Sequence, residues 1–217
     1  MAVIRTIEEK CKRCYSCIRE CPAKAIKVEK GQAKVIESRC IGCGHCVHVC
    51  SQHAKAILSG IDQTVHYLNN EETVVAMIAP SFPSAFTGLE VQKLVGALKT
   101  CGFQRVVEVA FGADLINHAY VQLVKNNTDH EVRFPMITTS CPAICEYVEK
   151  YVPALIPNMA PVVSPMVAMG RVVRRYYGQN SKVVFIGPCS AKKVEADEEE
   201  VNDAVDVVLS FNELEDL

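Results

Sequence analysis

The sequence has 217 residues, a formal net charge of −2 and a hydrophobic fraction of 49%. This length suffices for two compact domains or one large one. A net charge so close to zero gives no reason to expect a nucleic-acid partner, and no apolar run reaches membrane-spanning length. Residues 1–10 are too charged for a secretory signal, so we expect a cytoplasmic protein. In that reducing compartment, twelve cysteines indicate metal ligands rather than disulfides.

Two short cysteine runs lie near the N-terminus. The first, CKRCYSCIRECP, has the spacing C-x2-C-x2-C-x3-C-P, and the second, CIGCGHCVHVC, repeats the cysteine spacing with Ser51 in place of the proline. Thiolate is a soft donor that suits iron in a cluster. Small residues such as Gly42 and Gly44 let the backbone approach a cubane closely. The fourth cysteine of such a run normally binds the other cluster.

The spacing therefore predicts two [4Fe-4S] clusters that exchange one ligand. One ligand set is Cys11, Cys14, Cys17 and Cys50, and the other is Cys40, Cys43, Cys46 and Cys21. A pair of zinc sites is the alternative, but zinc knuckles usually pair two C-x2-C units across a longer loop. The tetrapeptide AKAI after each run, at 23–26 and 54–57, favours an internal duplication. Residues 1–60 resemble a two-cluster bacterial ferredoxin, with a small α+β fold.

Residues 61–72 form a polar connector, after which the hydrophobic pattern changes. Short apolar runs predict strands at 73–80, 105–110, 135–141, 182–189 and 204–211. Apolar residues at helical spacing predict helices at 89–103, 113–127, 142–155 and 164–178, and a further helix starts within 211–217. Strands that alternate with helices indicate a mostly parallel α/β domain over 73–217, with helices on both faces of its sheet.

Ligands of such folds gather beyond the carboxyl ends of the strands. Ala79, Pro80 and Ser81 lie at the carboxyl end of the first predicted strand, so we expect them to line a cofactor site. Cys141 and Cys189 also lie at the carboxyl ends of predicted strands and adjoin prolines, which favours a site at these two cysteines.

Two further cysteines stand apart from these patterns. For Cys101, a buried position as a small apolar residue is the favoured interpretation. Cys145 lies four residues after Cys141, on the same helix face, where it could serve as a metal ligand or as a packed thiol.

The later segments resemble the iron-only ([FeFe]) hydrogenase family, whose catalytic domain carries the motifs T-S-C-C-P and M-P-C-x-x-K-x-x-E. The matching stretches here are TTSCPAI at 138–144 and GPCSAKKVE at 187–195. FGADL at 111–115, IAPS at 78–81 and Ser164-Pro165 match further family segments in the family's order. The resemblance covers nearly the whole chain, as a ferredoxin domain followed by the first part of the hydrogenase domain.

This resemblance implies a third [4Fe-4S] cubane that is joined to a two-iron unit carrying CO and cyanide. Cys141 and Cys189 would be two ligands of that cubane. Lys192 would donate a hydrogen bond to a cyanide, and Glu195 would hold nearby polar groups. Without the motif, a solvated helix face is the simpler interpretation of Lys192 and Glu195.

Several positions depart from the family pattern. The proton-relay cysteine of the family corresponds to Ser140, a poorer proton carrier, which would nevertheless occupy the catalytic position. Tyr120 and Leu123 lie near the places of relay glutamates, Ala160 replaces a relay serine, and Gly187 replaces a methionine beside the metal. The remaining family cysteines are not among these 217 residues, so the active site is incomplete within them.

The resemblance implies an oxidoreductase whose ferredoxin clusters exchange electrons with a site that interconverts hydrogen and protons, slowly or as a sensor. Its partners would be a redox protein or ferredoxin, with further domains or subunits completing the site. A non-catalytic electron-transfer module with a hydrogenase-like scaffold is the alternative, and an iron–sulfur assembly factor is a weaker one.

Overall fold

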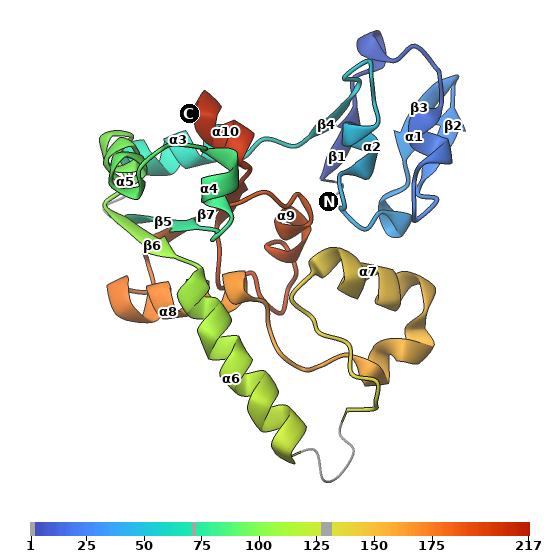
Figure 1. Ribbon diagram of the computed structural model, residues 1–217. Helices are drawn as coiled ribbons and strands as arrows, with labels where there is room; N and C mark the ends of the chain where they lie inside the picture. Colours follow the sequence, from blue (N-terminus) through green and yellow to red (C-terminus); the bar gives the residue numbers. More distant parts are fainter. Residues whose placement is uncertain (1–2, 71–72, 127–131) are drawn as a thin grey trace. The chain divides into compact units, whose positions relative to one another are not determined.

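The computed structural model describes residues 3–70, 73–126 and 132–217, which divide into two compact units (Figure 1). The first unit contains Met1–Leu58, Cys141–Ile156 and Cys189–Val194, and the second contains Ser59–Ser140, Pro157–Pro188 and Glu195–Leu217. The predicted domains are continuous in sequence, whereas the first unit also takes in two later segments. The expected connector, 61–72, includes a helix of the second unit, α3 (Ile61–Asn70).

The ferredoxin-like part of the first unit consists of very short elements arranged twice. In chain order these are β1 (Ile4–Thr6), η1 (Glu8–Lys10), α1 (Ser16–Arg19) and β2 (Ile26–Glu29), followed by β3 (Gln32–Val35), η2 (Glu37–Arg39), α2 (His45–His48) and β4 (Lys55–Ile57). Strand β1 pairs with β4 and β2 pairs with β3, both antiparallel. Helix α7 (Pro142–Tyr151) belongs to the same unit.

The two halves of this part have equivalent local geometry. The backbone N–H of Ala25 donates to Cys21 Sγ, and that of Ala54 donates to Cys50 Sγ, both at 3.3 Å. The residue before each alanine, Lys24 or His53, has a positive φ, of 47° and 49° respectively. Ala25 therefore corresponds to Ala54, and the two AKAI tetrapeptides that suggested a duplication are out of step by two residues.

The second unit is built on a parallel four-stranded sheet with the order β6-β5-β7-β8, which confirms the predicted α/β class. The strands are β5 (Val74–Ile78), β6 (Arg105–Glu108), β7 (Lys182–Ile186) and β8 (Val207–Leu209). The helices are α3, α4 (Phe82–Ala85), α5 (Val91–Thr100), α6 (Ala110–Asn126), α8 (Pro165–Tyr177) and α10 (Phe211–Asp216). Two further helices, α9 (Ala191–Glu195) and η3 (Pro153–Asn158), are divided between the two units, and Glu195 is the one residue of α9 in the second unit.

The core of the second unit fills both faces of the sheet. Strand β5 is buried along its whole length, as expected for a central parallel strand. Helices α3 and α5 lie on one side of the sheet and α8 on the other (Figure 1). Leu94 and Leu98 of α5, and Met166 and Val173 of α8, join the strand residues in one hydrophobic cluster.

Local signals fix the ends of the helices. Ser164 caps α8 by accepting the N–H of Val167, and Pro165 occupies its first turn. Ser210 and Glu213 form a capping box at the start of α10, where the sequence predicted a helix. Glu213 also accepts the N–H of Gly60 at 2.8 Å, which ties the start of α3 to this cap.

Two expectations about this unit are wrong. Residues 135–141 form no strand, and their described pairing is an isolated bridge between Ile137 and Met159. Pro135 lacks an N–H, and the N–H of Thr139 donates to the Tyr120 hydroxyl at 2.9 Å, so no strand ladder extends here. Cys101 is exposed rather than buried.

The exposure of Cys101 follows from how α5 ends. Gly102 has φ 109°, and its N–H bonds to Lys99 O while the N–H of Phe103 bonds to Leu98 O at 3.2 Å. This is a Schellman motif, in which the residue after the glycine packs back on the helix. Phe103 therefore fills the buried position beside Leu98, and Cys101 stays outside.

Close packing of α6 on α8 makes a glycine necessary, and this can be tested. A Cβ on Gly112 would lie 2.4 Å from Pro165 O, whereas a Cβ on Gly96 of α5 would meet nothing within 4 Å. We expect Gly112→Ala to lower the free energy of unfolding by about 1–3 kcal/mol through overpacking. Gly96→Ala, the matched control, should raise it by about 0.4–1 kcal/mol. Urea denaturation followed by circular dichroism measures both, and a stable Gly112→Ala variant would contradict the close contact.

Candidate metal centres

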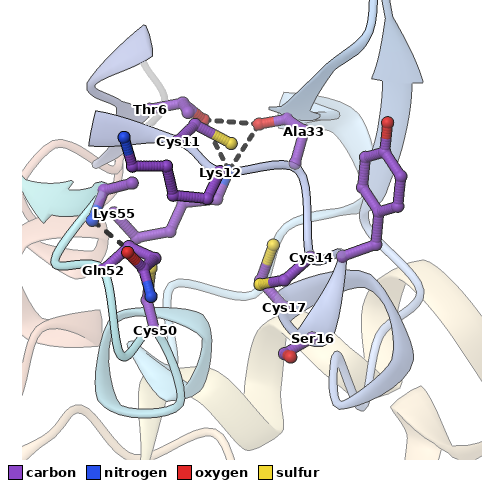
Figure 2. A pocket seen from close by; sticks show the side chains of 12 residues that line it. Thr6, Cys11, Lys12, Cys14, Ser16, Cys17, Ala33, Cys50, Gln52 and Lys55 are labelled. Carbon is purple, nitrogen blue, oxygen red and sulfur yellow. Dashed lines mark hydrogen bonds between the residues drawn. The ribbon is translucent and has the colours of Figure 1, made fainter. Parts of the chain in front are cut away.

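A pocket in the first unit is lined by four cysteines from both halves of the ferredoxin-like part (Figure 2). These are Cys11, Cys14, Cys17 and Cys50, which we call the first thiol ring. Cys11 follows η1, Cys17 lies in the single turn of α1, and Tyr15 before that turn has φ 57°, which bends the loop sharply. Cys50 reaches the ring from beyond α2 in the other half.

A second pocket repeats this arrangement with the other four cysteines. Its second thiol ring consists of Cys21, Cys40, Cys43 and Cys46. Gly42 and Gly44, with φ of 67° and 73°, shape the loop that carries Cys43. The rest of the lining is mainly apolar, and consists of Ile4, Pro22, Ala23, Ala25, Ile26, Val35 and Ile41.

Each ring fits an iron–sulfur cubane. Four thiols surround one cavity, and an amide N–H donates to Cys21 in one ring and to Cys50 in the other, as clusters require. Across residues 3–70, 73–126 and 132–217, no three Cys, His, Asp or Glu side chains lie close enough to share a single metal ion. The thiols are thus spread around a cavity, in the same two sets that the spacing predicts, and the ligand assignment stays a prediction.

Burial and hydrogen bonding set the protonation of these thiols in different directions. Burial raises the pKa of Cys46 to about 12, and it also raises the pKa of Cys17 and Cys40. At the exposed Cys14, hydrogen bonds from the backbone N–H and then the hydroxyl of Ser16 lower the pKa of the thiol. Thiolate is the metal-binding form, so iron must displace protons from the buried cysteines.

Two segments from later in the chain contact the loop of the second thiol ring. Directly after Cys189, the Ser190 hydroxyl donates to Gly42 O at 2.7 Å. A Cβ on Gly42 would lie 2.7 Å from a methyl of Val194, and a Cβ on Gly44 would lie 2.7 Å from Ser190 Oγ. The two glycines therefore serve this close packing as well as the turn.

Helix α7, which begins directly after Cys141, provides the other contact. Lys150 Nζ donates to Cys40 O at 2.7 Å and forms an ion pair with Glu146. The Tyr151 hydroxyl lies 2.6 Å from Ala23 O and 2.8 Å from Arg39 O, so it can donate its hydrogen to either carbonyl. Both segments that carry a predicted third-cubane cysteine thus pack on the same loop.

The remaining predicted site residues lie in varied surroundings. Lys192 and Glu195 are buried in α9, so the solvated-face interpretation is wrong. Ser140 is half-buried, Cys141 is exposed at the N-cap of α7, and Cys189 is half-buried after β7.

The residues expected to line a cofactor site follow β5. Ala79 is buried in the core, where its N–H donates to Ile186 O at 2.8 Å, while Pro80 and Ser81 are exposed. The structure does not gather these three around a described pocket, and their cofactor role stays a prediction.

Sequence reasoning missed Lys55, Lys150, Tyr151 and Ser190. No sequence signal marks the last three, since their contacts join residues more than a hundred positions apart. Lys55 could have been found, because aligning the two halves on their cysteines places it opposite Ile26.

Comparison with known proteins gives two family matches that together cover most of the chain. Residues 3–51 match a 4Fe-4S dicluster domain, and residues 72–217 match the family described as "Iron only hydrogenase large subunit, C-terminal domain". The chain belongs to the iron-only hydrogenase family. Its N-terminal part is accordingly an iron–sulfur domain.

Individual relatives agree with this membership. Iron hydrogenase 1 of Clostridium pasteurianum is 29% identical over 180 residues, which cover 72% of this chain and 31% of the relative. The NADP-reducing hydrogenase subunit HndD of Solidesulfovibrio fructosivorans is 26% identical over 171 residues, covering 67% of this chain and 29% of the relative. The chain thus spans about a third of the length of these relatives.

A solved [FeFe]-hydrogenase, studied for oxygen inactivation of its H cluster 2Fe subcluster, matches with a TM-score of 0.63 and 26% identity. The match covers 73% of this chain and 47% of that one. Among the residues whose placement is described, no helix has both the length and the hydrophobicity to cross a bilayer.

The contact of α7 with the second-ring loop leads to a prediction about Tyr151. Removing its hydroxyl leaves two carbonyls without that donor, which should cost about 0.5–1.5 kcal/mol of stability. Tyr147 stacks on Tyr151 but is exposed, so Tyr147→Phe keeps the ring contact and serves as the control. We expect Tyr151→Phe to unfold at lower urea than Tyr147→Phe under anaerobic conditions. Equal midpoints would mean that the hydrogen bond does not hold α7 in place.

Proposed function

We propose that this chain is the electron-relay portion of an [FeFe]-hydrogenase, in which two [4Fe-4S] clusters exchange electrons with a hydrogenase-like metal site. The observation that carries the proposal is the packing of the segments after Cys141 and Cys189 on the loop of the second thiol ring. Membership of the hydrogenase family and the hydrogenase names of the relatives support it. Because the chain spans only part of those relatives, their hydrogen chemistry is carried over as part of the proposal.

The residues of the chain perform three tasks in this scheme. The thiolates of each ring hold a cluster, which supplies one-electron redox chemistry. The N–H groups of Ala25 and Ala54 direct hydrogen bonds to Cys21 and Cys50, which stabilises charge on the sulfurs. The hydrogen bond from Ser190 to Gly42 O holds the Cys189 segment against the second ring, so an electron has a short bonded route between them.

At the proposed hydrogenase site, Cys141 and Cys189 hold the third cubane and the buried Lys192 supplies positive charge beside it. Glu195 positions polar groups near Lys192. Ser140 stands where the family has a relay thiol, and a hydroxyl releases its proton far less readily near neutral pH. Slow turnover, as in a hydrogen sensor, follows from this substitution.

Ser140 and Gly187 also favour a second candidate, a non-catalytic electron-transfer module. In that case the parallel sheet is a scaffold, and the clusters exchange electrons with a partner protein only. The two candidates differ in how much metal the protein holds and in what surrounds that metal.

Iron content distinguishes these candidates. The relay alone requires about eight irons per chain, while a third cubane on Cys141 and Cys189 brings the content to about twelve or more. Under the proposal, Cys189→Ala should lower the iron content of the reconstituted protein toward eight, whereas exposed Cys101→Ala should leave it unchanged.

Infrared bands from metal-bound CO and cyanide in the full-length, matured protein would support the hydrogenase site. A content of about eight irons per chain without such infrared bands would instead support the non-catalytic electron-transfer module. A zinc content matching the thiols, with no iron, would overturn both candidates.

Exchange of the fourth ligand between the rings can be tested with two double variants. If Cys50 belongs with Cys14, the chain Cys14→Ala/Cys50→Ala keeps its second ring intact and should hold about four irons there. Cys43→Ala/Cys50→Ala damages both rings and should hold almost none. Iron assay and electron paramagnetic resonance of the reduced proteins report the result, and the reverse pattern would show that each run binds its own cluster. Both are to be made in the Cys189→Ala background, so that no third cubane contributes iron.

A further inference from the structure

The ammonium group of Lys55 is buried beside the first thiol ring. Lys55 is 4% exposed, and its Nζ donates to Thr6 Oγ1 at 2.5 Å and to Ala33 O at 2.7 Å (Figure 2). The Thr6 hydroxyl in turn donates to Ala33 O at 2.5 Å. No acidic side chain forms an ion pair with this lysine in the part of the chain that the structure describes.

The equivalent position in the other half is apolar. Lys55 pairs with Thr6 across β1 and β4, while Ile26 pairs with Val35 across β2 and β3. Because Ala25 corresponds to Ala54, Ile26 is the twin of Lys55, and by the same alignment Val35 is the twin of Thr6. Ile26 is buried as deeply as Lys55, so the fold itself is satisfied by an apolar pair at this position.

A buried ammonium without a carboxylate partner requires another source of negative charge. Neutral oxygens satisfy its hydrogen bonds but do not neutralise it. The first pocket supplies the charge, since Lys55 lines it together with Cys11, Cys14, Cys17 and Cys50. Four thiolates outweigh the positive charge of an iron–sulfide core, and reduction adds one more negative charge.

The positive charge acts on both rings. Burial raises the pKa of Cys17 in the first ring and of Cys46 in the second, and the positive charge of Lys55 opposes this rise at both thiols. Lys12 also lines the first pocket, but it is exposed, so water and salt screen its charge.

We propose that Lys55 is a buried cation that stabilises the reduced form of the iron–sulfur clusters, the one in the first thiol ring most strongly. It thereby raises the reduction potential of that cluster. The electron comes from the redox partner or from the mediator of a titration. This inference rests on the proposed presence of the clusters. Lys55 acts through the charge of those clusters, so it is a positioning residue and not a catalytic one.

The test is a redox titration of the full chain with its clusters, followed by electron paramagnetic resonance. Lys55→Met should lower the ratio of reduced to oxidised first cluster at a fixed potential by about tenfold or more, which is a shift of about 59 mV for one electron. Lys55→Arg keeps the charge, so its ratio of reduced to oxidised first cluster should stay within about threefold of that of the natural protein. Lys12→Met, the matched control from the same pocket, should also stay within about threefold.

A double variant protects the test against a folding defect. Thr6→Val/Lys55→Ile copies the twin pair Val35 and Ile26, which already packs in the other half, and it should shift the first cluster as Lys55→Met does. The inference is overturned if Lys55→Met and the double variant both leave the ratio of reduced to oxidised first cluster within about threefold of the natural protein. It is also overturned if Lys55→Arg shifts that ratio as much as Lys55→Met does. Loss of iron from the double variant, with iron kept in Lys12→Met, would mean that the lysine is structural and would also overturn it. Absence of iron from the natural chain would instead defeat the proposed function.

Discussion

The gathering of eight thiols into two rings, each closed by a cysteine of the other half, is the constraint on which the first unit depends. Its strands have only three or four residues and its core is small, so apolar burial alone contributes little stability. Burial also raises the pKa of Cys17, Cys40 and Cys46 and so opposes their ionisation. A protonated thiol is unaffected by this cost, whereas a metal ligand must be ionised in spite of it. On the proposal that each ring holds a cluster, metal binding and folding are therefore coupled in this unit, and the crossing of Cys21 and Cys50 makes the coupling extend over both halves.

The second ring is also where later parts of the chain attach. Gly42 and Gly44 present bare backbone to Ser190, Ala191 and Val194, and no residue with a Cβ could take the place of either glycine without displacing its neighbour. Carbonyls of the same loop and of Ala23 accept hydrogen bonds from the end of α7. A contact made with backbone carbonyls depends little on the side chains of the loop. It therefore fixes the position of the second thiol ring and leaves the identity of the surrounding residues freer.

Short-range patterns predicted what local covalent spacing controls. The two thiol sets follow from cysteine spacing, and β5 and β7 follow from apolar runs that only a sheet covered on both faces can bury. The strand prediction for residues 135–141 failed because the hydroxyl of Tyr120, in the preceding helix α6, accepts the N–H of Thr139 that a strand would need. The prediction that Cys101 is buried failed because Phe103 occupies the buried position at the end of α5. Tyr151 and Ser190 could not be found, since their partners are fixed only by tertiary contact.

The duplication would give two alike clusters if the pocket walls were alike, but they differ. The first ring faces Thr6, Ser16, Gln52 and Lys55, while the second faces mainly alanine, valine and isoleucine side chains. An added electron is an added negative charge, which polar groups and a cation stabilise and an apolar wall does not. On the proposal made for Lys55, the first cluster therefore holds an electron more firmly than the second. The second cluster, which releases it more readily, is the one against which the Cys189 segment packs. On that proposal, the polar cross-strand pair Thr6–Lys55 converts a symmetric duplication into an ordered pair of electron carriers.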